Sequence, residues 1–272
     1  MRNFLALLAT ACVALFASLP ARAELRTRAV EYKHGDVTLE GYVAFDDTLA
    51  TEKSQRPGVL VCPEWWGVTD YVRLRARKLA ELGYVAFVLD PYGKGKVTTD
   101  PKQAGEWAGA LYANASLMRA RATAGLEQLL ALPQVDKSKL GVIGYCFGGT
   151  LALELARTGA DLDAVVPFHA GKLRSLGTPA DDKNIKGLIT VCHGLADAFV
   201  SDEEIAGFHA DMKTAGLTYQ FFGYSGAVHA FTNPDADKFG IPGIGYNAFA
   251  DSRSWEHMKL AFAEAFARTE KR

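Results

Sequence analysis

The feature of this sequence that most constrains its fold is a series of short, fully apolar runs separated by segments of helical periodicity. Two such runs are PGVLVC, residues 57–62, and YVAFVL, residues 84–89. Apolar runs of this length are typical of strands buried on both faces. Between them, residues 71–82 have apolar side chains at helical spacing and end at Gly83, as a helix C-terminus would. Strands that alternate with helices predict the α/β class, a mostly parallel sheet covered on both faces.

The same alternation continues along the chain. One long helical region is expected over about residues 102–131, stopped by Pro133. The stretch 233–245 is irregular and rich in Gly and Pro, so we expect a loop near a functional site. The other expected strands are 37–45 in an N-terminal hairpin, 140–144, 164–168, 188–192 and 218–222, and the other expected helices are 148–158, 203–215 and 255–268.

The first 23 residues have the pattern of a secretory signal peptide. A positive start is followed by an apolar run over residues 4–19, and Ala21-Arg22-Ala23 fits a small-x-small cleavage site. A membrane anchor is the alternative, but the run is shorter than the roughly 20 residues that a span needs, and Pro20 closes it. A lipoprotein processed at Cys12 fits poorly, because much of the apolar run lies beyond it. We expect cleavage after Ala23, a periplasmic or secreted protein, and no stable membrane association.

Cleavage would leave 249 of the 272 residues, which fits a single domain over residues 24–272. The removed segment carries Arg2 and Arg22 and no acidic residue, so the formal charge would change from −1 to −3. With this balance and no basic run, we expect no nucleic-acid partner. The oligomeric state cannot be inferred from the sequence.

Three cysteines would remain after cleavage: Cys62, Cys146 and Cys192. In an oxidising compartment an odd number leaves at least one free thiol. Cys62 and Cys192 both end apolar strands. The strand order that is usual for the predicted fold keeps those two strands apart, so no disulfide between them is expected. Because no Cys-x-x-Cys pair or Cys/His cluster has zinc spacing, the sequence predicts no metal site.

The stretch GYCFGG, residues 144–149, has the Gly-x-nucleophile-x-Gly spacing of a nucleophile elbow, with Cys146 in the place of the nucleophile. Strand-like residues precede it and helix-like residues follow, as this turn requires. Gly144 and Gly148 would admit close neighbours, and Cys146 would have a strained backbone. Its sulfur would stand at a helix N-terminus, where free N–H groups favour the thiolate. The alternative is a small buried cysteine beside a glycine-rich turn.

A thiol nucleophile needs a base, and the base needs an acid that orients it. Downstream of Cys146, in the order that this elbow uses, the sequence offers Asp197 and then His229. Asp197 follows the strand 188–192, at the edge where open α/β sheets bind ligands. His229 lies on a loop after the last strand, where catalytic residues are common. The alternatives are a capping aspartate and a loop histidine without function.

The other histidines are weaker candidates. His193 precedes Asp197 by four residues and is a rival base, which we interpret as local support. His169 follows the strand 164–168 and either lines the same site or lies on the surface. The remaining histidines are expected to be structural or exposed to solvent: His34, His209 and His257.

Five segments of the sequence together resemble the dienelactone hydrolase family of α/β-hydrolases, over nearly the whole chain from about Val37. They are residues 144–149, Cys62-Pro63-Glu64-Trp65-Trp66-Gly67, Asp90-Pro91-Tyr92, His193-Gly194-x-x-Asp197 and His229-Ala230-Phe231. The resemblance implies the α/β-hydrolase fold, a Cys-His-Asp triad and no cofactor. It also implies a small ester or lactone as substrate.

The family pattern assigns a role to each residue of the candidate site. Cys146, Asp197 and His229 form the triad, and the backbone N–H groups of Phe147 and Trp65 hold the oxyanion. In the family the glutamate at the position of Glu64 lies beside the thiol and helps convert it to the thiolate when substrate binds. A carboxylate there can hold a neutral thiol by a hydrogen bond and protect it from oxidation.

The sequence departs from the family at the residues that bind the substrate's carboxylate. Where members that cleave dienelactone have arginines, this chain has Lys94, which lacks the planar fork, and Asn233, which is uncharged. A less acidic ester or lactone is therefore expected. Trp65 is a further candidate for an apolar wall. The candidate substrate-binding residues are Trp66, Tyr92, Lys94, Tyr145, His169 and Asn233.

The sequence thus predicts a hydrolase of small carboxylic esters or lactones with a cysteine nucleophile. A broad carboxylesterase with little preference for lactones is one alternative. A non-hydrolytic thiol protein, either a redox sensor or a binding module, is the other, since a free thiol is expected in an oxidising space.

Overall fold

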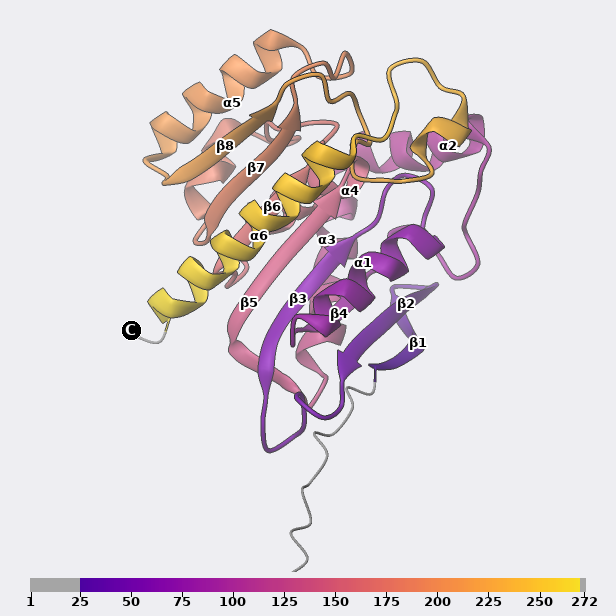
Figure 1. Cartoon of the computed structure of the whole chain (residues 1–272), viewed down its shortest axis with the longest axis vertical. Helices are drawn as coiled ribbons and strands as arrows, with labels where there is room; N and C mark the ends of the chain where they lie inside the picture. Colours follow the sequence, from indigo (N-terminus) through magenta and orange to yellow (C-terminus); the bar gives the residue numbers. More distant parts are fainter. Residues whose placement is uncertain (1–24, 270–272) are drawn as a thin grey trace, which may run out of the picture.

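The computed structural model describes residues 25–269, so the predicted signal peptide lies outside the described residues. At its centre is an eight-stranded sheet in the order β1-β2-β4-β3-β5-β6-β7-β8 (Figure 1). β4, β3, β5, β6, β7 and β8 pair in parallel, whereas β2 is antiparallel to both of its neighbours. The strands are β1 (Leu25–His34), β2 (Val37–Asp46), β3 (Arg56–Cys62), β4 (Val85–Val88), β5 (Val135–Tyr145), β6 (Ala164–Phe168), β7 (Leu188–Gly194) and β8 (Tyr219–Tyr224).

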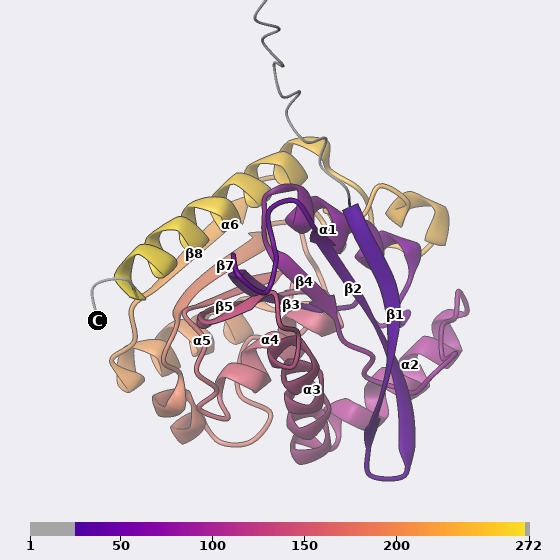
Figure 2. The same cartoon turned by 90° about the horizontal axis from the view of Figure 1, so that it is seen from below.

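Helices cover both faces of the sheet. α1 and α6 lie on one face, and α3, α4 and α5 lie on the other (Figures 1 and 2). The helices are α1 (Asp70–Glu81), α2 (Pro101–Tyr112), α3 (Ala115–Leu130), α4 (Phe147–Ala156), α5 (Asp202–Ala215) and α6 (Ala248–Thr269), and the 3₁₀ turns are η1 (Pro179–Asn184) and η2 (Ala236–Phe239).

The apolar runs of the sequence form the two halves of the core. In β3, Val59 and Val61 pack towards α1 and α6, while Leu60 packs towards α3 and α4. All three side chains are fully buried. Burial of each such side chain stabilises the fold by about 1.5–3 kcal/mol, which is why unbroken apolar runs form the central strands. The predicted α/β architecture is therefore confirmed.

Several predicted boundaries differ from the observed ones. The helical region predicted over residues 102–131 is two helices, because Asn114 begins a new one by accepting a hydrogen bond from the N–H of Leu117 at 3.0 Å. β5 begins at Val135 rather than at Leu140, and α6 begins at Ala248 rather than at residue 255. The loop 233–245 contains the short turn η2.

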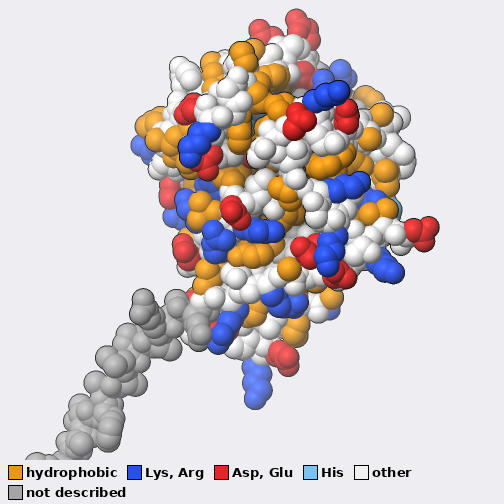
Figure 3. Space-filling view, turned by 90° about the vertical axis from the view of Figure 1, so that its right-hand side faces the viewer, with side chains coloured by type: hydrophobic (Ala, Val, Ile, Leu, Met, Phe, Trp, Pro, Cys, Tyr) orange, Lys and Arg blue, Asp and Glu red, His pale blue; other side chains and the backbone are white. Residues whose placement is uncertain are grey.

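Cys62 and Cys192 are both free and buried, as predicted. They end β3 and β7, which β5 and β6 separate. None of the helices described between residues 25 and 269 is long and apolar enough to cross a bilayer. On the face seen in Figure 3, Lys and Arg side chains are interspersed with Asp and Glu, so the described residues of this face form no patch of one charge.

Candidate active site

Cys146 lies in a sharp turn between β5 and α4. Its backbone has φ 55° and ψ −120°, a region that L-residues rarely adopt. A Cβ atom at Gly144 would overlap the carbonyl oxygen of Gly148, and one at Gly148 would overlap that of Cys62. Both glycines are therefore required for the close approach of β3, β5 and α4. The predicted elbow geometry is present.

A buried histidine holds the backbone of Cys146. The N–H of Cys146 points at Nδ1 of His169 and at the carbonyl oxygen of Phe168, both at 3.0 Å. Because Nδ1 accepts this bond, the proton of the neutral ring is on Nε2, which donates to Oγ1 of Thr232 at 2.7 Å. Burial, with the nearby positive groups, places the pKa of His169 well below its usual value. His169 is therefore neutral and orders the turn.

The hydrogen bonds continue beyond Thr232 to a buried ion pair. Oγ1 of Thr232 lies 2.6 Å from the hydroxyl of Tyr71, which accepts from Nε of Arg75 at 3.3 Å. Nη2 of Arg75 also donates to the carbonyl of Thr232 and to the carboxylate of Asp251, the latter at 2.6 Å. Arg75 is 2% exposed. This chain ties the turn at Cys146 to α1 and α6.

Asp197 and His229 form a buried hydrogen-bonded pair. Nδ1 of His229 lies 2.7 Å from Oδ2 of Asp197, and the other carboxylate oxygen accepts from the N–H of Phe199 at 2.9 Å. Burial alone would lower the pKa of His229, but the charge and hydrogen bonding of Cys146 and Asp197 raise it to about 10. His229 therefore interacts with the sulfur on one side and with the carboxylate on the other. The structure brings the three residues together.

The loop predicted near the site positions His229. The N–H of His229 donates to the carbonyl of Gly243, and the N–H of Gly245 donates to the carbonyl of His229, both at 3.1 Å. Ala230, the next residue, has φ 58°. Positive φ in non-glycine residues is uncommon, and residues 25–269 include three of them: Cys146, His169 and Ala230.

Glu64 follows β3 and is buried, at 2% exposure. Its Oε2 accepts a hydrogen bond from Nδ2 of Asn233 at 2.9 Å, rather than the expected bond from the thiol. Burial raises the pKa of Glu64 to about 7, although the Asn233 bond and the positive charges of His229 and Arg75 oppose the shift. Near neutral pH both the protonated and the ionised form of this carboxyl group are therefore populated.

Of the two expected oxyanion donors, Phe147 directly follows Cys146 and Trp65 lines the same pocket as Cys146. Phe147 is the first residue of α4, so its N–H is among those that have no acceptor within the helix. Trp65 lies in the turn after β3, and its side chain forms part of the wall of the pocket above Cys146.

An open pocket of about 250 Å³ lies over Cys146 and His229. Its wall is mostly apolar, and the loop 233–245 contributes Ile241 and Ile244. Lys172 is the one cationic side chain in this wall apart from His229, and its amine forms no ion pair with any residue between 25 and 269. The lining residues are Trp65, Tyr112, Cys146, Gly171, Lys172, Phe199, His229, Ile241 and Ile244.

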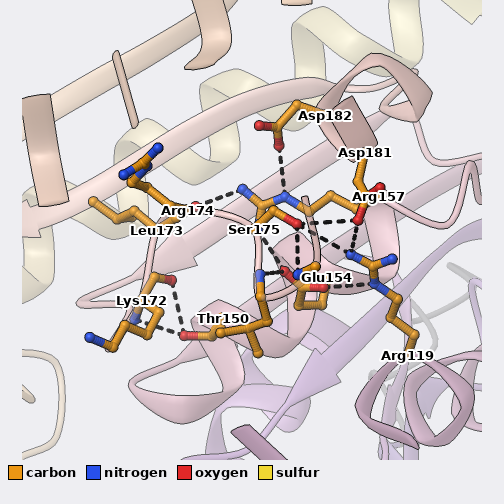
Figure 4. Close-up of polar contacts among 12 residues, drawn as sticks. Arg119, Thr150, Glu154, Arg157, Lys172, Leu173, Arg174, Ser175, Asp181 and Asp182 are labelled. Atoms are coloured by element: carbon orange, nitrogen blue, oxygen red, sulfur yellow. Dashed lines mark hydrogen bonds and ion pairs between the residues drawn. The ribbon is translucent and has the colours of Figure 1, made fainter. Parts of the chain in front are cut away.

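A buried ion network holds the segment that carries Lys172 (Figure 4). Arg157 is fully buried and binds Glu154 at 3.0 Å and Asp182 at 2.7 Å. Arg119 binds the second oxygen of Glu154 at 2.7 Å. The hydroxyl of Thr150 both accepts from the N–H of Lys172 and donates to its carbonyl. In Figure 4 the amine of Lys172 points away from this network.

None of the six predicted substrate-binding residues lines this pocket. Lys94 pairs with Glu31 and Glu40 on the surface, and Asn233 is buried against Glu64. The expectation of a less acidic substrate rested on these two positions, so the structure removes its basis.

The other four are aromatic or histidine side chains that pack elsewhere. Trp66 packs between Trp65 and Phe239, and Tyr145 is fully buried against Phe168. Tyr92 lines a different pocket, and the ring of His169 accepts a hydrogen bond from the backbone N–H of Cys146. His169 was predicted from its position after the strand 164–168, and the three aromatic residues were predicted as parts of an apolar wall. Neither argument sets the direction of a side chain. His193 is buried against Phe221, and burial lowers its pKa.

Sequence reasoning missed Tyr112, Gly171, Lys172 and Phe199. Gly171 and Lys172 follow β6 at the same sheet edge as Cys146, so the rule that placed Asp197 there would also have found them. Tyr112 was missed because the sequence predicted one continuous helix over residues 102–131. In the structure α2 ends at Tyr112, and the chain turns there.

The fold and the arrangement of the elbow, acid and histidine define an α/β-hydrolase. The profile of the Dienelactone hydrolase family matches residues 41–266, and the chain belongs to that family. A solved structure, the dienelactone hydrolase-like promiscuous phosphotriesterase P91 from metagenomic libraries, is 38% identical with a TM-score of 0.85, over 90% of this chain and 99% of its own.

Two further similarities agree with this assignment. The solved structure m3DLH is 39% identical, with a TM-score of 0.84, over 89% of this chain and 98% of its own. A protein of Aquifex aeolicus (strain VF5) that carries the provisional name carboxymethylenebutenolidase is 32% identical, over 75% of this chain and 86% of its own. The chain is therefore similar to hydrolases of this family along most of its length.

Proposed function

We propose that the protein hydrolyses small carboxylic esters or lactones with Cys146 as the nucleophile and His229 and Asp197 as its partners. The observation that carries the proposal is the contact of His229 with both Cys146 and Asp197, which raises the pKa of the imidazole to about 10. At neutral pH this favours a thiolate beside an imidazolium. The provisional name of the Aquifex aeolicus relative supports a lactone as substrate.

The proposed reaction proceeds through a thioester on Cys146. The thiolate attacks the carbonyl carbon, and the N–H groups of Phe147 and Trp65 bind the oxyanion, each contributing about 3 kcal/mol. The C–O bond to the leaving group breaks, and the imidazolium of His229 protonates the leaving oxygen. Neutral His229 then removes a proton from water, whose oxygen attacks the thioester. The acid is released, and the thiolate and imidazolium are restored.

The test is mass spectrometry of the protein after brief mixing with p-nitrophenyl acetate. We expect a transient acetyl group on Cys146 and steady release of p-nitrophenol. In Cys146→Ala both should be lost, while Cys192→Ala, which changes a buried thiol outside the pocket, should behave as the wild type. Turnover by Cys146→Ala at the wild-type rate would refute the proposal.

Rates on unsaturated lactones and on simple aryl esters separate a lactonase from a broad carboxylesterase. Equal kcat/KM values would favour the carboxylesterase. If no acyl group forms but peroxide readily converts Cys146 to the sulfenic acid, the redox alternative is favoured.

A second candidate activity is phosphotriester hydrolysis. It is favoured by the 38% identity to P91, whose name states that activity, over 90% of this chain. Release of p-nitrophenol from paraoxon by the wild type, but not by Cys146→Ala, would support it.

We also propose that the protein is exported, on the basis of residues 1–23 alone. Expression of the full chain in a Gram-negative host, followed by N-terminal sequencing of the periplasmic fraction, tests this. An N-terminus at Glu24 is expected, and retention of Met1 in the cytoplasm would contradict the proposal.

A further inference from the structure

Phe147 contacts a residue in the wall of each of two pockets: Tyr112 of the pocket above Cys146, and Tyr92 of a second pocket. The volume of the second pocket is about 180 Å³. The ring of Tyr92, which lines this second pocket, stacks on that of Phe147, with centroids 5.7 Å apart. The pocket lies between the loop after β4, α2 and α3. It is lined by Pro91, Tyr92, Lys96, Trp107, Ala110, Leu111, Leu117 and Arg121.

Arg121 brings a buried positive charge to this pocket. The residue is 6% exposed, and its Nε and Nη1 atoms are buried without a hydrogen-bond partner among residues 25–269. The hydroxyl of Tyr92 is likewise buried without a partner there. A buried guanidinium without hydrogen bonds is unfavourable, so a ligand that satisfies it gains more than it would at the surface.

The nearest acidic group does not complete the site. The charge of Asp90 acts on Arg121 but forms no ion pair with it. One oxygen of Asp90 accepts the N–H groups of Tyr92 and Gly93, and the other accepts that of Glu40, at 2.9–3.0 Å. Asp90 is therefore hydrogen-bonded to the backbone and not to Arg121, whose Nε and Nη1 atoms stay available.

The other residues that line this pocket suit a ligand with an apolar ring or chain and a terminal anionic group. Tyr92 and Trp107 present aromatic rings with centroids 5.5 Å apart, and Leu111 and Leu117 add apolar surface. The amine of Lys96 lies 5.9 Å from the centre of the Trp107 ring and adds a second positive charge. A cavity of about 150 Å³ accepts benzene, so this one has room for a ring with a small charged group.

We propose that this pocket binds a small organic oxyanion, a carboxylate or a phosphate ester, with Arg121 and Lys96 holding the charged group and Tyr92 and Trp107 holding the carbon body. None of these residues lines the pocket above Cys146. The proposal is therefore independent of the function proposed for Cys146.

The test is isothermal titration of the folded protein with benzoate, phenyl phosphate and the neutral analogue benzamide. Cys146→Ala is included because it should bind benzoate as the wild type does. Arg121→Met should weaken binding of the anions about tenfold or more. Lys102→Gln removes an equal charge from an exposed position of α2 outside the pocket and is the control. Because Arg121→Met removes a buried charge without a partner, its melting temperature should not fall.

The titration has clear outcomes in both directions. Binding of benzoate or phenyl phosphate that Arg121→Met weakens about tenfold or more and Lys102→Gln leaves unchanged would support the proposal, and the tighter of the two anions would identify the ligand class. Equal binding of benzamide and benzoate, or no binding of either anion by the wild type, would overturn it. These two results do not depend on how any variant folds. Lys96→Gln, at an exposed position, should weaken anion binding about threefold, and unchanged binding would count against Lys96.

Discussion

The backbone N–H of Cys146 lies 3.0 Å from Nδ1 of His169, a residue from the next strand end. A histidine outside the predicted triad thus orders the turn that presents the candidate nucleophile. The bond requires a neutral ring with its proton on Nε2, and burial favours the neutral form. This hydrogen bond helps to offset the backbone strain at Cys146, whose φ is 55°.

Replacement of His169 should therefore impair the turn rather than the chemistry itself. We expect His169→Leu to lose about 1–3 kcal/mol of stability, since the N–H of Cys146 and the hydroxyl of Thr232 lose a partner. His169→Asn should retain more of it, because its oxygen can replace Nδ1 and Asn tolerates the positive φ of 37°. Urea unfolding and kcat for both variants check this. Equal losses of stability and kcat in the two variants would show that the hydrogen-bond acceptor at position 169 does not stabilise the turn.

Asp197→Asn should uncouple the imidazole from its acid. Asn retains the oxygen that accepts the N–H of Phe199 but removes the charge that raises the pKa of His229. We expect kcat to fall about 10²–10⁴-fold and the pKa of His229, followed by NMR, to be lower than in the wild type. An unchanged midpoint would mean that Asp197 does not set the charge of this ring.

The parts of the site that sequence reasoning predicted are those that local sterics or chain order determine. Gly144, Gly148 and Cys146 predict the elbow because only glycine permits the observed backbone contacts. Asp197 and His229 follow from the order of the elements along the chain. The fold follows from apolar runs that can be buried only in a sheet covered on both faces.

What could not be predicted is the direction of side chains beyond the strand ends. Asn233 occupies a family position that binds substrate, yet it folds onto Glu64 because that buried carboxylate needs a donor. His169 turns inward to Cys146, and Lys172, three residues further along the same loop, lines the pocket instead. The directions of Asn233 and His169 depend on their contacts with Glu64 and Cys146, which are distant in sequence, and no local pattern encodes them.

Glu64→Gln should change how stability depends on pH. The folded pKa of about 7 lies above the usual 4.5, so the folded state binds more protons than the unfolded state between these values. The stability that this proton contributes is complete below pH 4.5 and is lost as pH rises through about 7, in total about 3 kcal/mol. Relative to the wild type, Glu64→Gln should gain about this amount between pH 5 and pH 8.

Urea unfolding at several pH values measures this difference. Glu127→Gln, at an exposed position of α3, is the control and should follow the wild type. If the wild type and Glu64→Gln lose stability in parallel as pH rises, Glu64 does not titrate near neutrality.

Lys172 should favour substrates that carry a negative charge. Its amine has no acidic partner among the described residues, and Lys172 lines the pocket above Cys146. We expect Lys172→Met to lower kcat/KM about fivefold for a monosuccinate aryl ester and to leave the acetate ester unchanged, an effect that weakens at high salt. Lys183→Met, an equal charge change on η1, should alter neither. Parallel losses on both esters would refute a charge effect.

Arg157→Met should be the most destabilising of these substitutions. Arg157 is the cation between Glu154 and Asp182, all three are fully buried, and burial already raises the pKa of Asp182. Removal of one partner of a buried pair costs about 3–5 kcal/mol, because the remaining charges stay buried.

Arg119→Met is the matched control for this network. Arg119 is partly exposed, and Glu154 keeps Arg157 when it is lost, so about 1 kcal/mol or less is expected. Arg157 binds the carbonyl of Leu173 and the carboxylate of Asp182 and so holds the segment 171–182 in place. Because Gly171 and Lys172 of this segment line the pocket, Arg157→Met should also raise KM. Arg119→Met should change KM little. Denaturant unfolding with initial-rate kinetics measures both effects. Equal destabilisation by the two variants would place the stabilising interaction in the Arg119 contacts rather than in the buried Arg157.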